Sequence, residues 1–280
     1  MEKEFLTKTS RSVTLNVTGG KIDSFREQEE TTGTVRVYEN GCIGVAGCLG
    51  TPDEAALEKK AVKALALGIP YPCRLDGALE REEAHDEEII PVSRFIPTMQ
   101  RFLDRLGEMC PRFAFSNKIS LNDERAEYRN SQGRHLVSSG RSIDISLLAQ
   151  NRGSGNLFDT GLSYEGNCFD EDGLLAQFKK EYDAFYTPAD IEPGRYPVVM
   201  TAYGLFGTFL QHFVAEMYVS GASLLSGKLG QKVFSDNLSL RNDMNPATNP
   251  GARFFDEEGC VAPGLRPALI EKGTLTGLLT

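Results

Sequence analysis

The sequence predicts an α+β fold in which helices pack on antiparallel sheets. Apolar residues alternate with polar ones over Val13–Val17 and Ile143–Leu147, which is the two-residue period of a half-buried strand. Gly19-Gly20 and Asn40-Gly41 favour tight hairpin turns. Between the strand segments, apolar residues recur every three or four positions, as they do in a helix that buries one face.

Residues 1–71 are predicted to form an N-terminal β-meander followed by a helix. After the first strand and its return segment, Thr34–Tyr38 and Cys42–Ala46 give two strands joined by a hairpin turn. Thr51 is the predicted N-cap of the helix, because Pro and then acidic residues follow it. Gly68 ends the helix.

Residues 72–91 are predicted to be an acidic linker. Glu80–Glu88 contains six acidic residues and one arginine, and such a run is usually solvated and mobile. His85 lies among these carboxylates, but their spacing shows no metal-binding pattern. The segment is therefore expected to separate two folded domains.

Residues 92–190 are predicted to form a middle α+β domain. A helix is expected over Phe95–Cys110, and two long strands over Lys118–Arg129 and Arg134–Gln150. The turn-forming residues Asn130–Gly133 join the strands. A second helix is expected around Leu174–Phe185, so the domain pairs a hairpin with helices.

Residues 191–280 are predicted to begin a C-terminal domain. A buried strand is expected over Val198–Ala202, followed by a long helix from about Leu205 to Val219. A short strand over Asn237–Leu240 and a hairpin over Ala268–Thr280 complete the segment.

Composition excludes several classes of function. The formal net charge is −9 and the isoelectric point is about 5.0, so the surface repels phosphate backbones and nucleic-acid binding is not expected. No apolar run approaches the ~20 residues of a membrane helix, and no signal peptide is present, so a cytoplasmic location without membrane attachment is expected. The six cysteines form no Cys-x-x-Cys motif, which argues against zinc-ribbon and thioredoxin-like sites.

Several motifs resemble those of one family, the TldD/PmbA (TldD/TldE) peptidases, also named modulators of DNA gyrase. Their order and spacing across nearly the whole chain carry the resemblance more than any single motif does. The matching segments are Gly33–Gly44, Asn130–Gly133 with its flanking strands, Pro193–Val199, Ser223–Gly230, Phe254–Gly259 and Leu269–Gly277.

The resemblance implies a fold of several α+β subdomains and a dimer around an internal chamber. In this family a TldD-type subunit holds zinc through His-Glu-x-x-x-His and a distant C-terminal Cys, and a TldE/PmbA-type subunit lacks the metal. The pair cleaves unfolded peptides and trims leader peptides. Because family members continue beyond Thr280, the predicted C-terminal domain is a shortened one, and the implied partners are a TldD-type subunit, a second copy of the chain, or both.

The zinc motif is missing at the matching positions. Counted back from Ser223–Gly230, its first His, Glu and second His fall on Phe206, Gly207 and Gln211. None of these supplies the imidazole, carboxylate or thiolate that zinc requires. The resemblance therefore implies a metal-free TldE/PmbA-like subunit that shapes the chamber and binds extended peptide, with zinc in its partner. Nothing in the residues supports a role on gyrase or DNA.

Two other functions stay open. His212 and Glu216 are four residues apart and would share one helix face, so they are candidate catalytic or metal-binding residues of a self-contained peptidase. Asp256 or Glu257, in the family-like turn that ends at Gly259, could supply a third ligand. An ordinary polar pair on a helix is the preferred interpretation of His212 and Glu216, because such pairs are common on helices that bind no metal. The other alternative is a peptide-binding or scaffold protein without enzymatic activity.

Overall fold

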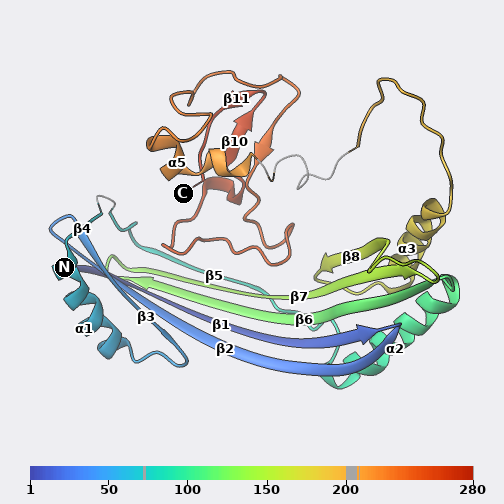
Figure 1. The fold of residues 1–280 in the computed structure, drawn as a ribbon. Coiled ribbons are helices and arrows are strands. Elements are labelled where there is room, and N and C mark those ends of the chain that lie inside the picture. Colours follow the sequence, from blue (N-terminus) through green and yellow to red (C-terminus); the bar gives the residue numbers. More distant parts are fainter. Residues whose placement is uncertain (72–73, 200–206, 208, 280) are drawn as a thin grey trace. The chain divides into compact units, whose positions relative to one another are not determined.

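The structure, a computed structural model, describes residues 1–71, 74–199, 207 and 209–279 (Figure 1). The chain forms two compact units. The first contains Met1–Pro188 and Pro246–Cys260, and the second contains Ala189–Asn245 and Val261–Thr280. The division differs from the predicted one, because residues 1–71 and 92–188 belong to one unit and a later segment of the chain returns to it.

The first unit is built on one eight-stranded sheet with the order β4-β3-β2-β1-β6-β7-β5, in which β8 also pairs with β7. All pairings are antiparallel except that of β5 with β7. The strands are β1 (Glu2–Thr18), β2 (Lys21–Glu39), β3 (Cys42–Leu49), β4 (Ile69–Pro70), β5 (Leu79–His85), β6 (Phe113–Asn130), β7 (Arg134–Asn151) and β8 (Thr160–Gly166).

Three of the four central strands, β1, β2 and β6, are longer than the sequence pattern predicts, whereas β7 matches its predicted range to within one residue. β1 and β2 pair from Glu2 opposite Tyr38 to Thr18 opposite Lys21, with one register shift between Asn16 and Val17. The prediction placed a return segment and a separate strand in what is one strand of 19 residues, β2. Residues 23–30 of β2 are exposed on both faces, so they show no apolar alternation that would reveal a strand.

The predicted acidic linker, residues 72–91, contains a strand. Leu79–His85 forms β5, which pairs in parallel with the start of β7 from Arg134 to Gly140. Its charged side chains are compatible with this position because β5 is an edge strand, and charges on an edge discourage pairing with other molecules. The acidic run was therefore wrongly interpreted as a spacer between domains.

Helices cover one face of this sheet (Figure 1). α1 (Glu54–Ala64) packs on β2 and β3, and α2 (Val92–Met109) packs on β2 and β6. A 3₁₀ turn, η1 (Leu65–Leu67), follows α1, and α3 (Glu171–Phe185) packs on α2. These helices agree with the predicted positions to within a few residues.

The N-cap of α1 is Asp53 and not the predicted Thr51. The Asp53 carboxylate accepts a hydrogen bond of 3.0 Å from the backbone N–H of Ala56. Replacing Asp53 with Ala is expected to lower the free energy of unfolding by about 1 kcal/mol, because one N–H of the first turn loses its acceptor. Urea denaturation measures this. Thr51→Ala is the control and should change stability by less than about 0.5 kcal/mol.

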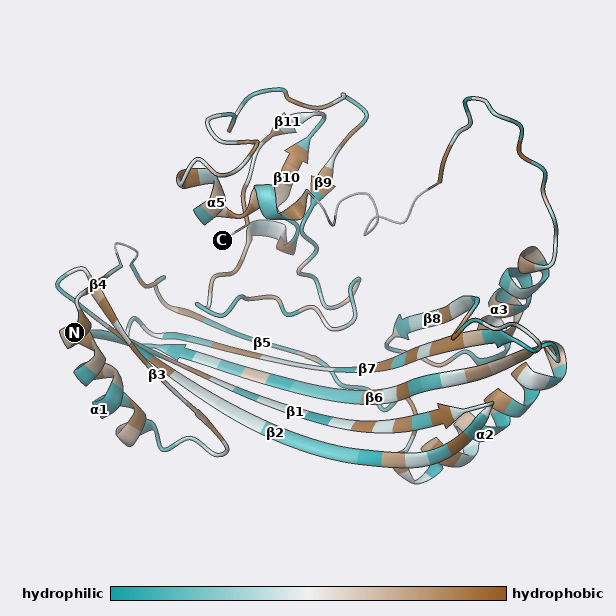
Figure 2. Ribbon diagram, viewed as in Figure 1, coloured by the Kyte–Doolittle hydropathy of each residue, from teal (hydrophilic) through white to brown (hydrophobic). Residues whose placement is uncertain are grey.

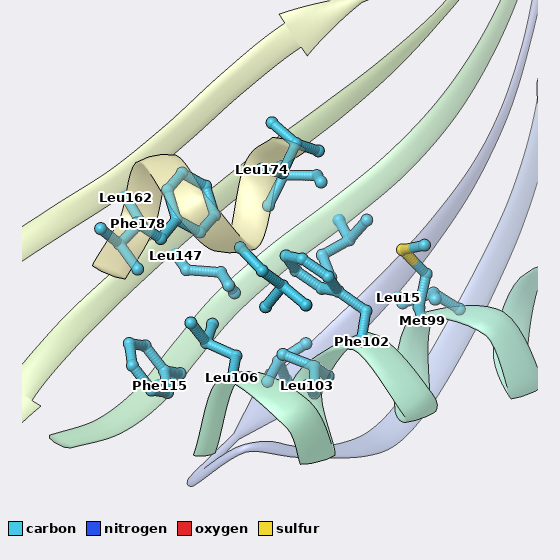
Figure 3. Packing of buried hydrophobic residues seen from close by; sticks show 14 of the residues in the cluster. Leu15, Met99, Phe102, Leu103, Leu106, Phe115, Leu147, Leu162, Leu174 and Phe178 are labelled. Carbon is cyan, nitrogen blue, oxygen red and sulfur yellow. The ribbon is translucent and has the colours of Figure 1, made fainter. Parts of the chain in front are cut away.

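Two apolar clusters lie at opposite ends of the long strands. One joins α1 to β2 through Val35, Val37, Leu57 and Ala61. The larger cluster joins α2, α3 and the sheet, with Phe102, Leu147 and Phe178 packed together (Figure 3). Between the two clusters the strands are hydrophilic (Figure 2).

The second unit is small and has its own core. Phe213, Leu225, Leu269, Ile270 and Leu275 are buried together. Its elements are η2 (Leu210–Phe213), α5 (Ala215–Val219), β9 (Leu240–Arg241), η3 (Pro263–Leu265), β10 (Ala268–Glu271) and β11 (Thr274–Leu275). The predicted hairpin around Lys272-Gly273 is present as β10 and β11.

The predicted long helix from Leu205 to Val219 is not continuous. The described part is a 3₁₀ turn and a short helix, separated at Val214, which has an extended backbone with ψ of 127°. The predicted buried strand Val198–Ala202 is also wrong where the structure describes it, because Val198 and Val199 are exposed. Within the described residues, no helix is both long and apolar enough to cross a membrane.

Candidate functional site

The face of the first sheet opposite α1 and α2 is polar in the middle of the long strands. One row of paired residues crosses it: Glu30 lies opposite Ser10, Ser10 opposite Glu124, Glu124 opposite Gly140, and Gly140 opposite His85. Directly paired residues point to the same face of a sheet. The five strands therefore place two carboxylates, a hydroxyl and an imidazole along one line.

A cavity of about 480 Å³ lies over this row. Its floor includes Ser10, Glu124 and Ser138. Pro250 and Arg253 also line it, and they belong to Pro246–Cys260, the later part of the chain that returns to the first unit and is called the returning segment below. The volume lies in the range of small-molecule sites in proteins. The cavity is the main candidate for a binding site in the described part of the first unit.

The returning segment carries the family-like turn. Asp256 organises it, because its carboxylate accepts hydrogen bonds of 2.9 Å from the backbone N–H groups of Glu258 and Cys260. Gly259 has a φ of 73°, in the left-handed region that glycine adopts easily. Asp256 and Gly259 thus shape the backbone of the turn.

The turn is fixed to the sheet by buried contacts. Phe254 and Phe255 are 0% and 1% exposed, and the Phe255 ring packs near that of Tyr128. Arg36 donates a hydrogen bond of 2.8 Å to the Glu257 carbonyl, and Arg134 donates one of 2.7 Å to the Gly259 carbonyl. Two arginines of the sheet therefore hold the backbone of the turn.

A buried carboxylate, Glu4, lies beneath these contacts. Glu4 is 1% exposed and accepts hydrogen bonds from Arg36 at 2.6 Å and from the Tyr128 hydroxyl at 2.7 Å. Burial and the Glu4 charge raise the pKa of Tyr128 well above its ordinary value, so its hydroxyl stays a donor. Burial alone would lower the pKa of Arg36, but its hydrogen bond to Glu4 raises it above the usual value. The charged form of Arg36 is therefore secured at every physiological pH.

Glu257 borders the cavity and holds two cations. Its carboxylate accepts hydrogen bonds of 3.0 Å from Lys8 and from Arg253. Burial by itself would raise the pKa of Glu257, but these hydrogen bonds lower it below its ordinary value. The negative charge of Glu257 is thus already compensated within the protein.

The lowered pKa of Glu257 predicts a pH-dependent contribution to stability. Since the folded-state pKa is below the unfolded value near 4.5, the contribution is complete above pH 4.5 and disappears as pH falls through the lower folded value. Glu257→Gln should cost less than about 1 kcal/mol at pH 7, because the side chain is half exposed. Urea denaturation should show a larger difference from wild type at pH 7 than at pH 3, because the contribution diminishes as Glu257 becomes protonated. An equal difference at both values would contradict the prediction.

The positions that match the zinc motif supply no donor set for zinc. Phe206 lies outside the described residues, Gly207 has no side chain, and Gln211 is an exposed amide in η2. Within residues 1–71, 74–199, 207 and 209–279, no three His, Cys, Asp or Glu side chains are grouped to hold a metal ion. The residues at this place do not fit zinc.

His212 and Glu216 do not share one regular helix. They lie in η2 and α5, on either side of the extended Val214. The Nδ1 atom of His212 accepts a hydrogen bond of 3.3 Å from the Leu224 N–H. The backbone carbonyl of His212 accepts a hydrogen bond of 2.6 Å from the Ser223 hydroxyl. His212 thus has a structural role within the second unit, whereas Asp256 and Glu257 belong to the first.

Apart from Glu257 in the family-like turn, sequence patterns did not indicate the residues that line or support the cavity. Glu4, Arg36 and Tyr128 come from three strands, and Glu30 and Glu124 come from polar stretches without apolar alternation. The register of these three strands, β1, β2 and β6, brings them together. His85 was considered only as part of a linker, and β5 places it at the end of the polar row.

Two family models match the sequence. The model described as PmbA/TldA metallopeptidase domain 1 matches residues 8–68. The model described as PmbA/TldA metallopeptidase C-terminal domain matches residues 193–280. Together they cover more than half of the 280 residues. No curated protein gives a significant match.

Solved structures share the fold. A Thermotoga maritima protein described as a candidate modulator of a DNA gyrase is 17% identical with a TM-score of 0.80, and the match covers 99% of this chain and 66% of that one. TldE from Thermococcus kodakarensis is 20% identical with a TM-score of 0.76 and the same coverage. A Bacteroides thetaiotaomicron protein, also described as a candidate gyrase modulator, is 16% identical with a TM-score of 0.73, over 99% and 67% of the two chains.

The chain thus spans 66% of the length of the first two of these structures. Identities this low establish the fold and not the activity. The predicted α+β architecture is confirmed by this agreement. The two family models and the common fold show that the chain belongs to the PmbA/TldD family.

Proposed function

We propose that this chain is a metal-free, TldE-like subunit of a cytosolic zinc metallopeptidase that acts on unfolded peptides. The observation that carries the proposal is the loss of zinc donors: Gly207 and Gln211 occupy positions where a catalytic relative has Glu and His. The descriptions of the family models as metallopeptidase domains, and the similarity to a TldE structure, support it. Zinc and the general base then come from a TldD-type partner.

An unpaired strand edge supports a role in binding extended peptide. On its outer side, β2 is paired with β3 over its second half only, from Thr32 to Glu39. No described strand pairs with the outer edge of Lys21–Thr31. The Ile22 N–H donates to the Gln100 side chain and the Thr31 carbonyl accepts from the Gly50 N–H, so the edge open to a peptide is residues 23–30. An exposed edge of this length offers backbone donors and acceptors to an added strand. We therefore propose that this subunit holds the peptide substrate in an extended conformation.

Metal content and cleavage of an unfolded peptide test the proposal directly. The purified chain alone should contain no stoichiometric zinc and should cleave nothing, and adding a TldD-type protein should give cleavage. One zinc per chain together with cleavage by the chain alone would contradict the proposal. Peptide binding without any effect on a TldD-type protein would favour the scaffold function instead.

A substitution separates this proposal from a self-contained peptidase. His212→Ala removes a candidate zinc ligand of the second unit. If zinc comes from the partner, cleavage by the mixed proteins should be within about twofold of wild type once folding is verified. Loss of cleavage with a normal far-UV spectrum would assign His212 a catalytic role.

A further inference from the structure

The cavity over the polar row contains charges that the protein itself leaves uncompensated. Four cationic and three anionic side chains line it. Lys8 and Arg253 both pair with Glu257, and Arg141 pairs with Asp123. By contrast, Glu30 and Glu124 make no ion pair or hydrogen bond with any residue that the structure describes. The fourth cation, Arg125, lies 3.9 Å from Glu82. Because Lys8 and Arg253 share one carboxylate, they leave one positive charge, and the two unpaired glutamates add two negative charges, so the net charge of the cavity with these partners is −1.

The two free carboxylates flank one hydroxyl. Ser10 lies directly opposite Glu30 on β2 and directly opposite Glu124 on β6. Neighbouring strands are about 4.8 Å apart, so the Cα atoms of the two glutamates are roughly 10 Å apart. Gly140, the next residue of the row, has no side chain to close the space beside Glu124. A ligand can therefore lie along the row between the two carboxylates.

A buried hydroxyl also points to a ligand in this cavity. Ser138 lines the cavity and is only 6% exposed. Its hydroxyl makes no hydrogen bond with another described residue, and no fully enclosed polar atom of the described side chains lacks a partner. The Ser138 hydroxyl must therefore open into the cavity, where a bound group can satisfy it.

From this arrangement we infer that the cavity binds a ligand carrying two aliphatic ammonium groups, one held by Glu30 and the other by Glu124. An ammonium group donates three hydrogen bonds, so each can also reach hydroxyls such as Ser10 and Ser138. A metal ion fits less well, because the described His, Cys, Asp and Glu side chains form no group of three around it. An anion also fits less well, because Glu30 and Glu124 would repel it, and each lining cation lies within 4.0 Å of a carboxylate of the protein.

Two sources supply this chemistry. One is a free diamine such as cadaverine, and the other is a peptide with lysine at its N-terminus, whose α-amino and ε-amino groups are separated by the same five carbons. The inference does not depend on the peptidase partnership proposed above, since it concerns binding by this chain alone. Titration calorimetry of the full 280-residue chain with cadaverine and with a lysyl-alanyl-alanine amide compares the two sources.

Glu30→Gln and Glu124→Gln should each weaken binding about tenfold, because each removes one charge-assisted hydrogen-bond acceptor. Glu29→Gln is the matched control: it makes the same charge change one residue away on β2, on the opposite face of the sheet. It should leave affinity within about twofold. Pentylamine, with one ammonium group, should bind about tenfold more weakly than cadaverine.

Each outcome decides the inference. Binding of cadaverine alone identifies a free diamine, and binding of the peptide alone identifies a peptide N-terminus; either supports the site. No binding of either ligand at low ionic strength overturns it. Equal weakening by Glu29→Gln and Glu30→Gln also overturns it, because the attraction would then be a general effect of the acidic surface.

Discussion

Replacing Glu4 with Ala is expected to lower the free energy of unfolding by about 3 kcal/mol, one of the two largest effects expected in the first unit. The substitution leaves the Arg36 guanidinium, whose side chain is only 16% exposed, without its counter-charge. It also removes the acceptor of the buried Tyr128 hydroxyl. Both groups lose more than a contact, because a buried donor without a partner has also lost its hydration.

Equilibrium denaturation measures the loss, and Glu27→Ala is the matched control. Glu27 pairs with Arg11 between the same two strands, but both side chains are nearly half exposed. Its removal should cost less than about 1 kcal/mol, since water replaces an exposed partner at little cost. A loss for Glu4→Ala no greater than that for Glu27→Ala would show that the buried pair is not a stabilising contact.

The difference between these two glutamates also shows what the sequence could predict. Both are glutamates of the β1–β2 pair, and although Phe5 and Leu6 follow Glu4, the local pattern does not predict that the Glu4 carboxylate is buried. Burial of Glu4 comes from a segment about 250 residues later, whose Phe254 and Phe255 cover this end of the sheet. Hydrophobic periodicity reports which face of a strand is apolar and gives no information about a distant segment that returns to cover a polar residue.

The elements with strong local signals were predicted well. α2 and α3 have apolar residues at helical spacing, and Asn130–Gly133 joins β6 to β7 as expected. β5 was missed because most of its residues are charged and its stability comes from pairing with β7. The break at Val214 was missed because apolar residues on both sides continue a helical spacing. Tertiary contacts decide both cases.

The candidate site could be predicted only in part for the same reason. Asp256, Glu257 and Gly259 were identified from their family-like motif, and the structure places them where the returning segment meets the sheet. Glu30 and Glu124 carry no motif, and only strand register aligns them with Ser10. A candidate site on a polar sheet face without a sequence motif can therefore be identified only from the three-dimensional structure.

Replacing Gly259 with Ala is expected to cost about 3 kcal/mol or more, because two penalties add. An alanine with a φ of 73° is strained by about 1–2 kcal/mol. Its Cβ would also lie 2.2 Å from the Tyr128 ring, which is fully buried and held through its hydroxyl by Glu4. The ring cannot move away freely, so the turn must shift and weaken its hydrogen bonds to Arg36 and Arg134.

Gly41→Ala separates the two penalties, because Gly41 has the same φ of 73° but a Cβ there would meet no atom within 4 Å. It should therefore cost only about 1–2 kcal/mol, from backbone strain alone. Denaturation curves compare the two variants, and limited proteolysis should show cleavage within residues 246–260 in Gly259→Ala only. Equal losses of stability, with no new cleavage, would mean that the turn is not held in place by close packing against Tyr128.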